Sequence, residues 1–317
     1  MTEGSESAAR GTTADAGAEG RPAVALVGAG NMGGAIGRRL LACGHRLAVF
    51  DPDASARRAL VELGASECED AAGAAATARF TILSLNAAGI VERAAFGERG
   101  VVAGAPAGGI VIDMSSIDPV ATRAFAARAS EAGLRWLDCP LSGGAPKAVT
   151  GELAVFAGGD AEGLRAARAV LDSLSDNCTH LGDSGAGQTV KLINQVLAAS
   201  TLLAVAEAVS LARAAGVDAA RLPAALAGGR ADGAILREYV PKMAGDDRAP
   251  TGRLDNMLKD LDAALALGAR LEAPLPVTTL CAGVHRRLVE RGLGDRDLAE
   301  LVRHYDDPDA PDGDPPC

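Results

Sequence analysis

The chain has 317 residues, of which 48% are hydrophobic and 23% are charged, so neither a disordered chain nor a small disulfide-built domain fits. At roughly 150 residues per domain, this length predicts about two domains. The formal net charge is −10, and the aromatic residues are five Phe, two Tyr and one Trp. A protein that is acidic and poor in aromatic residues is not expected to have a nucleic-acid partner.

The first 20 residues are small, polar and acidic, and they lack the basic start and apolar stretch of a signal peptide, so we predict a disordered tail over 1–20. The uncharged run 192–206 contains polar residues and is too short to span a membrane. The six cysteines are scattered, with no C-x-x-C pair and no histidine at ligand spacing. We therefore expect reduced thiols, no metal site, no membrane partner and a cytoplasmic location.

Apolar runs of strand length then alternate with alanine-rich helical stretches, which predicts a parallel sheet covered by helices on both faces. After five such runs, two more strand-like runs follow, ELAVFAGG from Glu152 and NCTHLG from Asn177. They extend this α/β domain over 21–183. The first five runs are VALVG from Val24, LAVF from Leu47, FTILSL from Phe80, IVIDM from Ile110 and LRWLDCP from Leu134.

From Gly187 to Ala215 the sequence is apolar nearly all round, which predicts a long helix buried inside a domain or against another subunit. A homodimer or homotetramer is therefore expected. Only helical patterns follow, so we predict an all-α domain over 184–305 that the long helix joins to the sheet domain. The Pro- and Asp-rich residues 306–317 are expected to form a flexible acidic tail.

Gly28, Gly30 and Gly33 have G-x-G-x-x-G spacing between the first predicted strand and a helix. In a Rossmann-type fold, the first glycine permits a tight turn, the second lets the main chain approach a pyrophosphate, and the third lets the helix pack on the strand. Asn31 and Met32 lie in the same loop and are expected at the cofactor. The alternative is a glycine-rich turn without a ligand.

Asp51 lies at the end of the second predicted strand, 23 residues after Gly28, where a carboxylate can accept hydrogen bonds from the adenosine ribose. Such a carboxylate repels a 2′-phosphate, so NAD is favoured over NADP. Two alternatives stay open. Arg57 and Arg58 are close enough in sequence to reach a phosphate, and Asp51 is also placed to cap a helix that begins near Ala54.

Two later segments carry candidate chemistry. The turn Ser142-Gly143-Gly144 follows a predicted strand and offers consecutive N–H groups to a carboxylate, although an ordinary turn is the simpler interpretation. Lys191, Asn194 and Gln195 lie one helical turn apart on one face of the long helix.

Because burying an ammonium group is costly, Lys191 has either a function or an exposed place at the start of the long helix. A second lysine, Lys259, lies in the segment 257–262, which by itself indicates a solvated helix face of mixed charge.

Together these pieces resemble the β-hydroxyacid dehydrogenase family over 22–305. The family includes 3-hydroxyisobutyrate dehydrogenase, tartronate semialdehyde reductase and L-threonate dehydrogenase. Five segments appear in the family's order: GAGNMGGAI, VIDMSSIDP, DCPLSGGAPKAVTGELAVFAGG, GAGQTVKLINQ and MLKDLDAAL.

The resemblance implies a Rossmann-type domain, a long interdomain helix and an all-α domain, with the site between the domains. It implies that Ser142, Gly143 and Gly144 hold the substrate carboxylate, that Lys191 is catalytic and that Lys259 lies near the cofactor or substrate.

Four further positions refine the resemblance. Ser115 and Ser116 stand where the family usually has Ser-Thr and are expected to line the nicotinamide pocket. Gln195 stands where many members have a second Asn, and the tartronate semialdehyde branch is similar in using Gln. Asn86 lies in a loop similar to the Asn-Ala-Ala of L-threonate dehydrogenases, which favours a polyhydroxylated acid as the substrate.

The implied activity is reversible, NAD-dependent hydride transfer at the β-hydroxyl carbon of a small hydroxy acid, of the L-threonate, D-glycerate/tartronate semialdehyde or 3-hydroxyisobutyrate type. Lys191 would act as general acid/base, with Asn194 and Gln195 positioning the substrate and the amine. One alternative is an imine reductase of the same architecture, which the retained Lys191 disfavours. The other is a noncatalytic dinucleotide-binding module.

Overall fold

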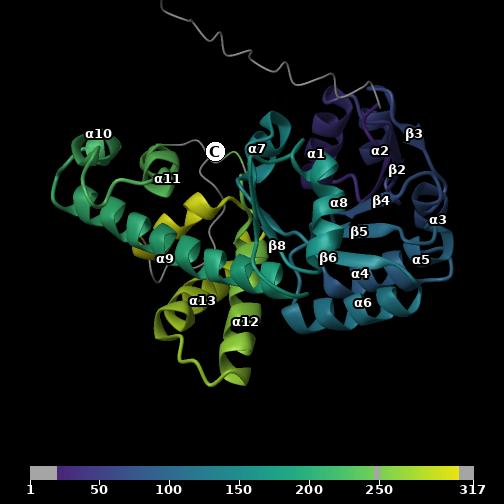
Figure 1. The fold of residues 1–317 in the computed structure, drawn as a ribbon. Helices are drawn as coiled ribbons and strands as arrows, with labels where there is room; N and C mark the ends of the chain where they lie inside the picture. The colour runs from purple at the N-terminus through teal and green to yellow at the C-terminus, as the bar shows by residue number, and fades with distance from the viewer. Residues whose placement is uncertain (1–19, 246–248, 250, 307–317) are drawn as a thin grey trace, which may run out of the picture.

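The computed structural model describes residues 20–245, 249 and 251–306. The predicted tails, 1–20 and 306–317, lie outside the described residues except for Gly20 and Asp306. The chain forms an α/β lobe followed by a helical lobe (Figure 1), which confirms the predicted fold class. The domain boundary at 183/184 stays a prediction.

The α/β lobe is built on a six-stranded parallel sheet with the order β3-β2-β1-β4-β5-β6. Its central strands are buried along their whole length, which explains why they read as continuous apolar runs. The two-residue edge strand β3 was not predicted, because so short a segment carries no periodicity. The strands are β1 (Val24–Val27), β2 (Leu47–Phe50), β3 (Ser66–Glu67), β4 (Phe80–Leu83), β5 (Ile110–Asp113) and β6 (Arg135–Asp138).

Helices cover both faces of this sheet (Figure 1). Four of them begin at an aspartate whose carboxylate accepts a backbone N–H of the first turn, namely Asp53, Asp70, Asp118 and Asp160. The helices of this lobe are α1 (Asn31–Ala42), α2 (Ala54–Val61), α3 (Ala71–Ala75), α4 (Ala88–Phe96), α5 (Val101–Gly104), α6 (Pro119–Glu131), α7 (Gly144–Thr150) and α8 (Ala161–Leu171).

A second, three-stranded sheet leads from the α/β lobe toward the helical lobe. Its strands are β7 (Leu141–Ser142), β8 (Ala154–Ala157) and β9 (Asn177–His180), with β7 antiparallel and β9 parallel to β8. Strands β8 and β9 correspond to the two strand-like runs that the sequence predicts, whereas the two-residue β7 was missed.

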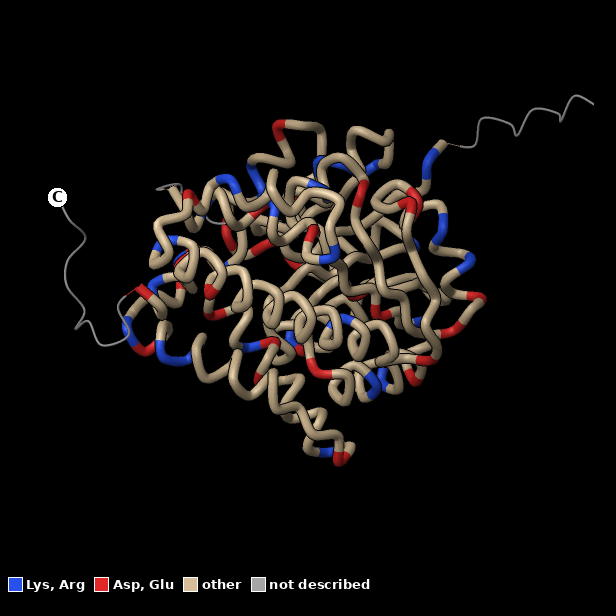
Figure 2. The backbone as a smooth tube through the Cα atoms, turned by 90° about the vertical axis from the view of Figure 1, so that its left-hand side faces the viewer, with Lys and Arg blue, Asp and Glu red and all other residues tan. Residues whose placement is uncertain are grey.

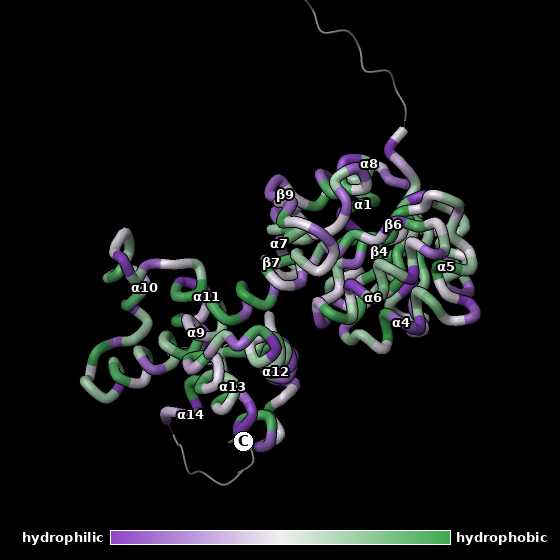
Figure 3. Tube along the Cα trace, turned by 60° about the horizontal axis from the view of Figure 1, so that its bottom comes forward, coloured by the Kyte–Doolittle hydropathy of each residue, from purple (hydrophilic) through white to green (hydrophobic). Residues whose placement is uncertain are grey.

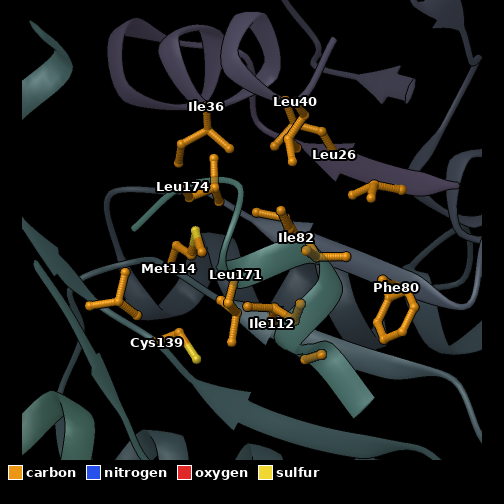
Figure 4. Close-up of a cluster of buried hydrophobic side chains, with 14 of the residues drawn as sticks. Leu26, Ile36, Leu40, Phe80, Ile82, Ile112, Met114, Cys139, Leu171 and Leu174 are labelled. Atoms are coloured by element: carbon orange, nitrogen blue, oxygen red, sulfur yellow. The ribbon is translucent and has the colours of Figure 1, made fainter. Parts of the chain in front are cut away.

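The core of the α/β lobe is mainly aliphatic, and Figure 4 shows side chains from β1, β4, β5, α1 and the segment after α8 meeting in it. A separate aromatic group lies under the outer helices. In this group Trp136 of β6 stacks on Phe96 with ring centroids 5.8 Å apart, and Phe125 packs at 5.9 Å from Trp136. The labelled aliphatic core residues include Leu26, Ile36, Leu40, Ile82, Ile112, Leu171 and Leu174.

The helical lobe is arranged around α9 (Ala186–Ala214), the long helix that the sequence predicts. One side of α9 packs against α11, α12 and α13. The remaining elements of this lobe are η1 (Ala219–Arg221), α10 (Leu222–Leu226), α11 (Ala234–Ala244), α12 (Leu254–Arg270), α13 (Pro276–Leu288), η2 (Val289–Leu293), η3 (Leu298–Val302) and α14 (Arg303–Asp306).

The opposite side of α9 is apolar but exposed. Ile193, Leu197 and Leu211 are 53%, 64% and 70% exposed, and residues 193 and 211 share one face because they are five helical turns apart. By length and composition α9 is apolar enough to cross a membrane, and 39% of its most apolar 18-residue window is buried inside the protein. Figure 3 shows the apolar segments of this lobe, and Figure 2 shows acidic and basic residues interspersed along the chain.

Candidate active site

The predicted phosphate loop joins β1 to α1. A Cβ atom on Gly28 would lie 2.4 Å from the Ser84 carbonyl oxygen, and one on Gly33 would lie 2.0 Å from the Gly28 carbonyl oxygen, so packing excludes a side chain at both positions. A Cβ atom on Gly30 would meet no atom within 4 Å. Packing therefore does not account for Gly30, whereas the close approach of a ligand does.

The start of α1 is also open to an anion. Gly30 precedes the helix, and no side chain caps its first turn, so the first amides keep their donors for a ligand. Asn31 lines a cavity of about 280 Å³ beside this loop, and Met32 packs on the aliphatic core. The residues of this loop therefore fit a dinucleotide pyrophosphate.

Asp51 folds back onto the phosphate loop. Its carboxylate accepts hydrogen bonds from the amide of Ala29 at 2.7 Å and from the amide of Asp53 at 2.8 Å. Asp53 caps α2, so the capping alternative for Asp51 is wrong. Arg57 donates to the Glu67 carboxylate at 2.7 Å and to the Asp51 carbonyl, and both contacts engage its guanidinium.

The loops after β4 and β5 meet at the carboxyl edge of the sheet, because these strands are parallel neighbours. The Leu85 amide donates to Ser115 Oγ at 3.1 Å. Lys259 Nζ of α12 donates to the carbonyl oxygens of Asn86 and Ser116, both at 3.1 Å. Lys259 thus connects the helical lobe with both loops of the sheet domain, while its side chain remains 40% exposed on a helix face of mixed charge.

Lys191, Asn194 and Gln195 form one cluster on α9, as their spacing predicts. Lys191 Nζ and Asn194 Nδ2 both donate to Gln195 Oε1, each at 3.0 Å. Lys191 is half-buried, and burial lowers the pKa of its ammonium group, while the nearby Asp260 carboxylate raises that pKa and Lys259 lowers it. The amine therefore lies at the junction of the two domains and not at an exposed helix start.

Asp260 of α12 joins this cluster to the sheet domain and was missed by the sequence analysis. Its carboxylate accepts from Gln195 Nε2 at 2.7 Å and from Ser116 Oγ at 3.2 Å, and lies 3.4 Å from Lys259 Nζ. A signal was present, because Asp260 occupies the apolar face that Met257, Leu261 and other buried residues of α12 define. A carboxylate on the buried face of a helix requires partners.

Two more buried polar residues fix the start of α9 against the sheet. The Asp138 carboxylate at the end of β6 accepts the amides of Gly185 at 2.8 Å and Gln188 at 3.0 Å. The Gln188 side chain donates to the Ser115 carbonyl at 2.7 Å and accepts from the Ile117 amide at 3.2 Å. These contacts fix the position of α9, which carries Lys191, relative to the loop after β5.

The turn Ser142-Gly143-Gly144 connects β7 to α7. Gly143 and Gly144 have φ values of 128° and 74°, which favour glycine, and the first amides of α7 have no acceptor within the helix. In the part of the chain that the structure describes, no hydrogen bond joins this turn to Lys191. Their connection runs through Asp138, which precedes the turn and holds the start of α9.

A dinucleotide-binding sheet domain, with a lysine cluster where it meets a helical domain, defines an NAD(P)-dependent oxidoreductase. Residues 23–182 match the NAD binding domain of 6-phosphogluconate dehydrogenase, and residues 185–305 match the NAD-binding domain of NADP-dependent 3-hydroxyisobutyrate dehydrogenase. The chain belongs to the β-hydroxyacid dehydrogenase family, of the 3-hydroxyisobutyrate dehydrogenase type.

Curated relatives agree with this family. The chain is 33% identical to the NAD-dependent L-serine dehydrogenase of Pseudomonas aeruginosa, over 89% of this chain and 97% of the relative. It is 35% identical to the 3-hydroxyisobutyrate dehydrogenase of the same organism, over 81% and 89% of the two chains. It is 32% identical to the 2-hydroxy-3-oxopropionate reductase of Escherichia coli, over 88% and 95%.

Solved structures show the same architecture. The 3-hydroxyisobutyrate dehydrogenase of Mycobacterium tuberculosis with L-serine superposes with a TM-score of 0.80 at 29% identity, covering 89% of this chain and 98% of that one. An imine reductase of Myxococcus stipitatus superposes with a TM-score of 0.58 at 21% identity, covering 89% and 98%, which shows a shared fold alone.

Proposed function

We propose that the protein is an NAD-dependent β-hydroxyacid dehydrogenase that transfers a hydride reversibly between the nicotinamide and the β-hydroxyl carbon of a small hydroxy acid. The observation that carries this proposal is the half-buried Lys191 amine at the domain junction, connected to the loop after β5 through Gln195 and Asp260. The candidate substrates are L-threonate, D-glycerate or tartronate semialdehyde, and 3-hydroxyisobutyrate; L-serine joins them because one relative is named for it.

In the proposed reaction, Lys191 accepts the proton of the β-hydroxyl group during oxidation and returns it during reduction. An amine whose pKa is lowered by burial is suited to this exchange. Asn194 and Gln195 position the substrate and the amine, and the amides of the Ser142-Gly143-Gly144 turn hold the substrate carboxylate. NAD, when bound, supplies the hydride acceptor.

Several features support NAD over NADP. Asp51 lies on the phosphate loop, where its charge opposes a 2′-phosphate. Arg57, one of the two arginines close enough in sequence to reach such a phosphate, is engaged by Glu67 and by the Asp51 carbonyl. Gly28, Gly30, Gly33 and Asn31 would hold the pyrophosphate, while Ser115, Ser116, Asn86 and Lys259 would surround the nicotinamide.

The proposal includes a cytoplasmic homodimer or homotetramer without a membrane or nucleic-acid partner. The exposed apolar side of α9 supports an interface with a second copy of the chain. The five cysteines in the described residues are free thiols, which is consistent with a reducing compartment.

Formation of the reduced cofactor with each candidate acid, measured with NAD and with NADP, tests the function. Lys191→Ala is expected to lower kcat by about 10²- to 10⁴-fold while calorimetry shows unchanged NAD binding. Lys191→Arg keeps the positive charge but cannot release a proton near neutral pH, so it is expected to be equally impaired.

Near-normal turnover of Lys191→Ala would reject the role of the lysine. A kcat/KM that favours NADP tenfold or more would reject the cofactor preference. NAD binding without reduction by any of the acids would contradict the proposed activity.

A further inference from the structure

The Asp260 carboxylate of α12 contacts both α9 and the loop after β5. It accepts from Gln195 Nε2 of α9 at 2.7 Å and from Ser116 Oγ of the loop after β5 at 3.2 Å, and it pairs with Lys259 at 3.4 Å. Only 9% of its side chain is exposed. A carboxylate this buried, on the helical lobe but bound to the sheet domain, is costly unless its partners are fixed.

This contact decides which way the Gln195 amide faces. An ionised carboxylate only accepts hydrogen bonds, so Gln195 must present its NH₂ group to Asp260. The amide oxygen then points to the other side, where Lys191 Nζ and Asn194 Nδ2 both donate to it at 3.0 Å. In the reversed orientation, donors would face donors on one side and an acceptor would face an acceptor on the other.

The charges around Lys191 come from few elements. Asp260 favours the ammonium form, and Lys259 on the same helix opposes it. From the packed sheet domain, Asp138 lies under the start of α9, where the amides of Gly185 and Gln188 occupy both of its oxygens. Arg123 of α6 lies against Gly185 at the same end. Asp260 is thus the carboxylate that is connected to Lys191 through a single side chain.

We propose that Asp260 is a positioning residue for proton transfer: it orients the Gln195 amide so that its oxygen holds the Lys191 amine in place, and its charge stabilises the protonated amine. The inference rests on the proposed role of Lys191. It assigns Asp260 no contact with the substrate. The contact with Ser116 makes the same carboxylate a link between the amine and the expected nicotinamide pocket.

The first test measures the Lys191 amine without cofactor or substrate. The rate at which Lys191 reacts with acetic anhydride is followed against pH, by mass spectrometry of the peptide that contains it, to give the pKa of the amine. Asp260→Asn removes the charge but keeps the shape, and we expect it to lower this pKa by about one unit. The matched control is Asp262→Asn, whose carboxylate is exposed and pairs with Arg286 at 2.5 Å, and it should leave the value unchanged.

The second test uses the pH profile of kcat. In the oxidation direction the free amine is the active form, so Asp260→Asn should move the rising limb to lower pH. In the reduction direction the ammonium is active, so the falling limb should move to lower pH as well. Asp260→Ala also removes the acceptor that orients Gln195, and it is expected to lose at least a further tenfold in kcat relative to Asp260→Asn.

The outcomes separate this inference from the proposed function. Suppose that Lys191→Ala is inactive, but that Asp260→Asn changes neither the pKa of the Lys191 amine nor either limb of the kcat pH profiles. The proposed role of Asp260 is then wrong, and that of Lys191 stands. The same holds if Asp260→Asn only lowers the melting temperature. If Lys191→Ala turns over normally, the proposed proton transfer itself is wrong.

Discussion

Asp113 lies at the carboxyl edge of the sheet and, like Asp138, has no exposed surface. One carboxylate oxygen accepts the Ser115 amide at 3.0 Å, and among the described residues the other oxygen has no hydrogen-bond partner. Burial, together with the charge of Asp138 on the neighbouring strand, outweighs the hydrogen bonds from Ser115 and raises the pKa of this carboxyl to about 7. The folded protein therefore holds a proton here that the unfolded chain releases near pH 4.

We expect this group to make the protein less stable as the pH rises from about 4 to 7, because over this range the native state binds more protons than the unfolded state. In Asp113→Asn, which keeps the acceptor for Ser115, that part of the pH dependence should vanish. The difference is on the order of 4 kcal/mol between pH 4 and pH 8. Chemical unfolding of both proteins at a series of pH values measures it, and parallel stability curves would contradict the assignment.

At the scale of elements, α9 connects the two lobes, and its first turns are held by buried side chains rather than by loops. Gln188 satisfies both the Ser115 carbonyl and the Ile117 amide, so it fixes the helix against the loop that is expected to line the nicotinamide pocket. The position of Lys191 therefore depends on Gln188, which contacts neither substrate nor cofactor in the proposed mechanism.

Gln188→Leu leaves a buried carbonyl and a buried amide without partners, so we expect it to lower the free energy of unfolding by about 3 kcal/mol. Urea unfolding at one protein concentration measures this loss. Thr189→Val is the matched control, since its hydroxyl bonds only to the Gly185 carbonyl of the same helix end. If Gln188→Leu loses no more free energy of unfolding than this control, the side-chain hydrogen bonds of Gln188 do not stabilise the protein.

The sequence predicted the elements that have strong periodicity or marked ends. The central strands, the phosphate loop and α9 were placed within a residue or two, because buried strands read as apolar runs and the glycines mark the first turn. The short strands β3 and β7 were missed because two residues carry no pattern.

The cluster of Lys191, Asn194 and Gln195 followed from helical spacing. Asp260 and Gln188 did not, because their partners lie more than 60 residues away in the sequence, and only the fold brings them together.

At the scale of the whole molecule, the two lobes differ in how completely they cover their apolar surface. The side of α9 that carries Ile193, Leu197 and Leu211 is exposed in the single chain, as are Val277 and Leu280 of α13. In a monomer, such a patch favours self-association. The proposed oligomer would bury it.

We expect the double substitution Leu197→Glu and Leu211→Glu to shift the protein toward the monomer, because each change places a charge in the proposed interface. Light scattering coupled to size-exclusion chromatography measures the molar mass. Leu63→Glu, at a similarly exposed leucine of the sheet domain, is the control and should leave the mass unchanged. A monomeric parent protein, or an unchanged mass in the double variant, would reject the interface.

The aromatic group between β6 and the outer helices gives the protein an internal optical reporter. Trp136, the only tryptophan of the chain, is buried against Phe96 and Phe125 in the α/β lobe, whereas both tyrosines, Tyr239 and Tyr305, lie in the helical lobe. Indole emission therefore follows the melting of one lobe and phenol emission that of the other. A single fluorescence titration can thus reveal whether the lobes unfold together or in succession, without any added dye.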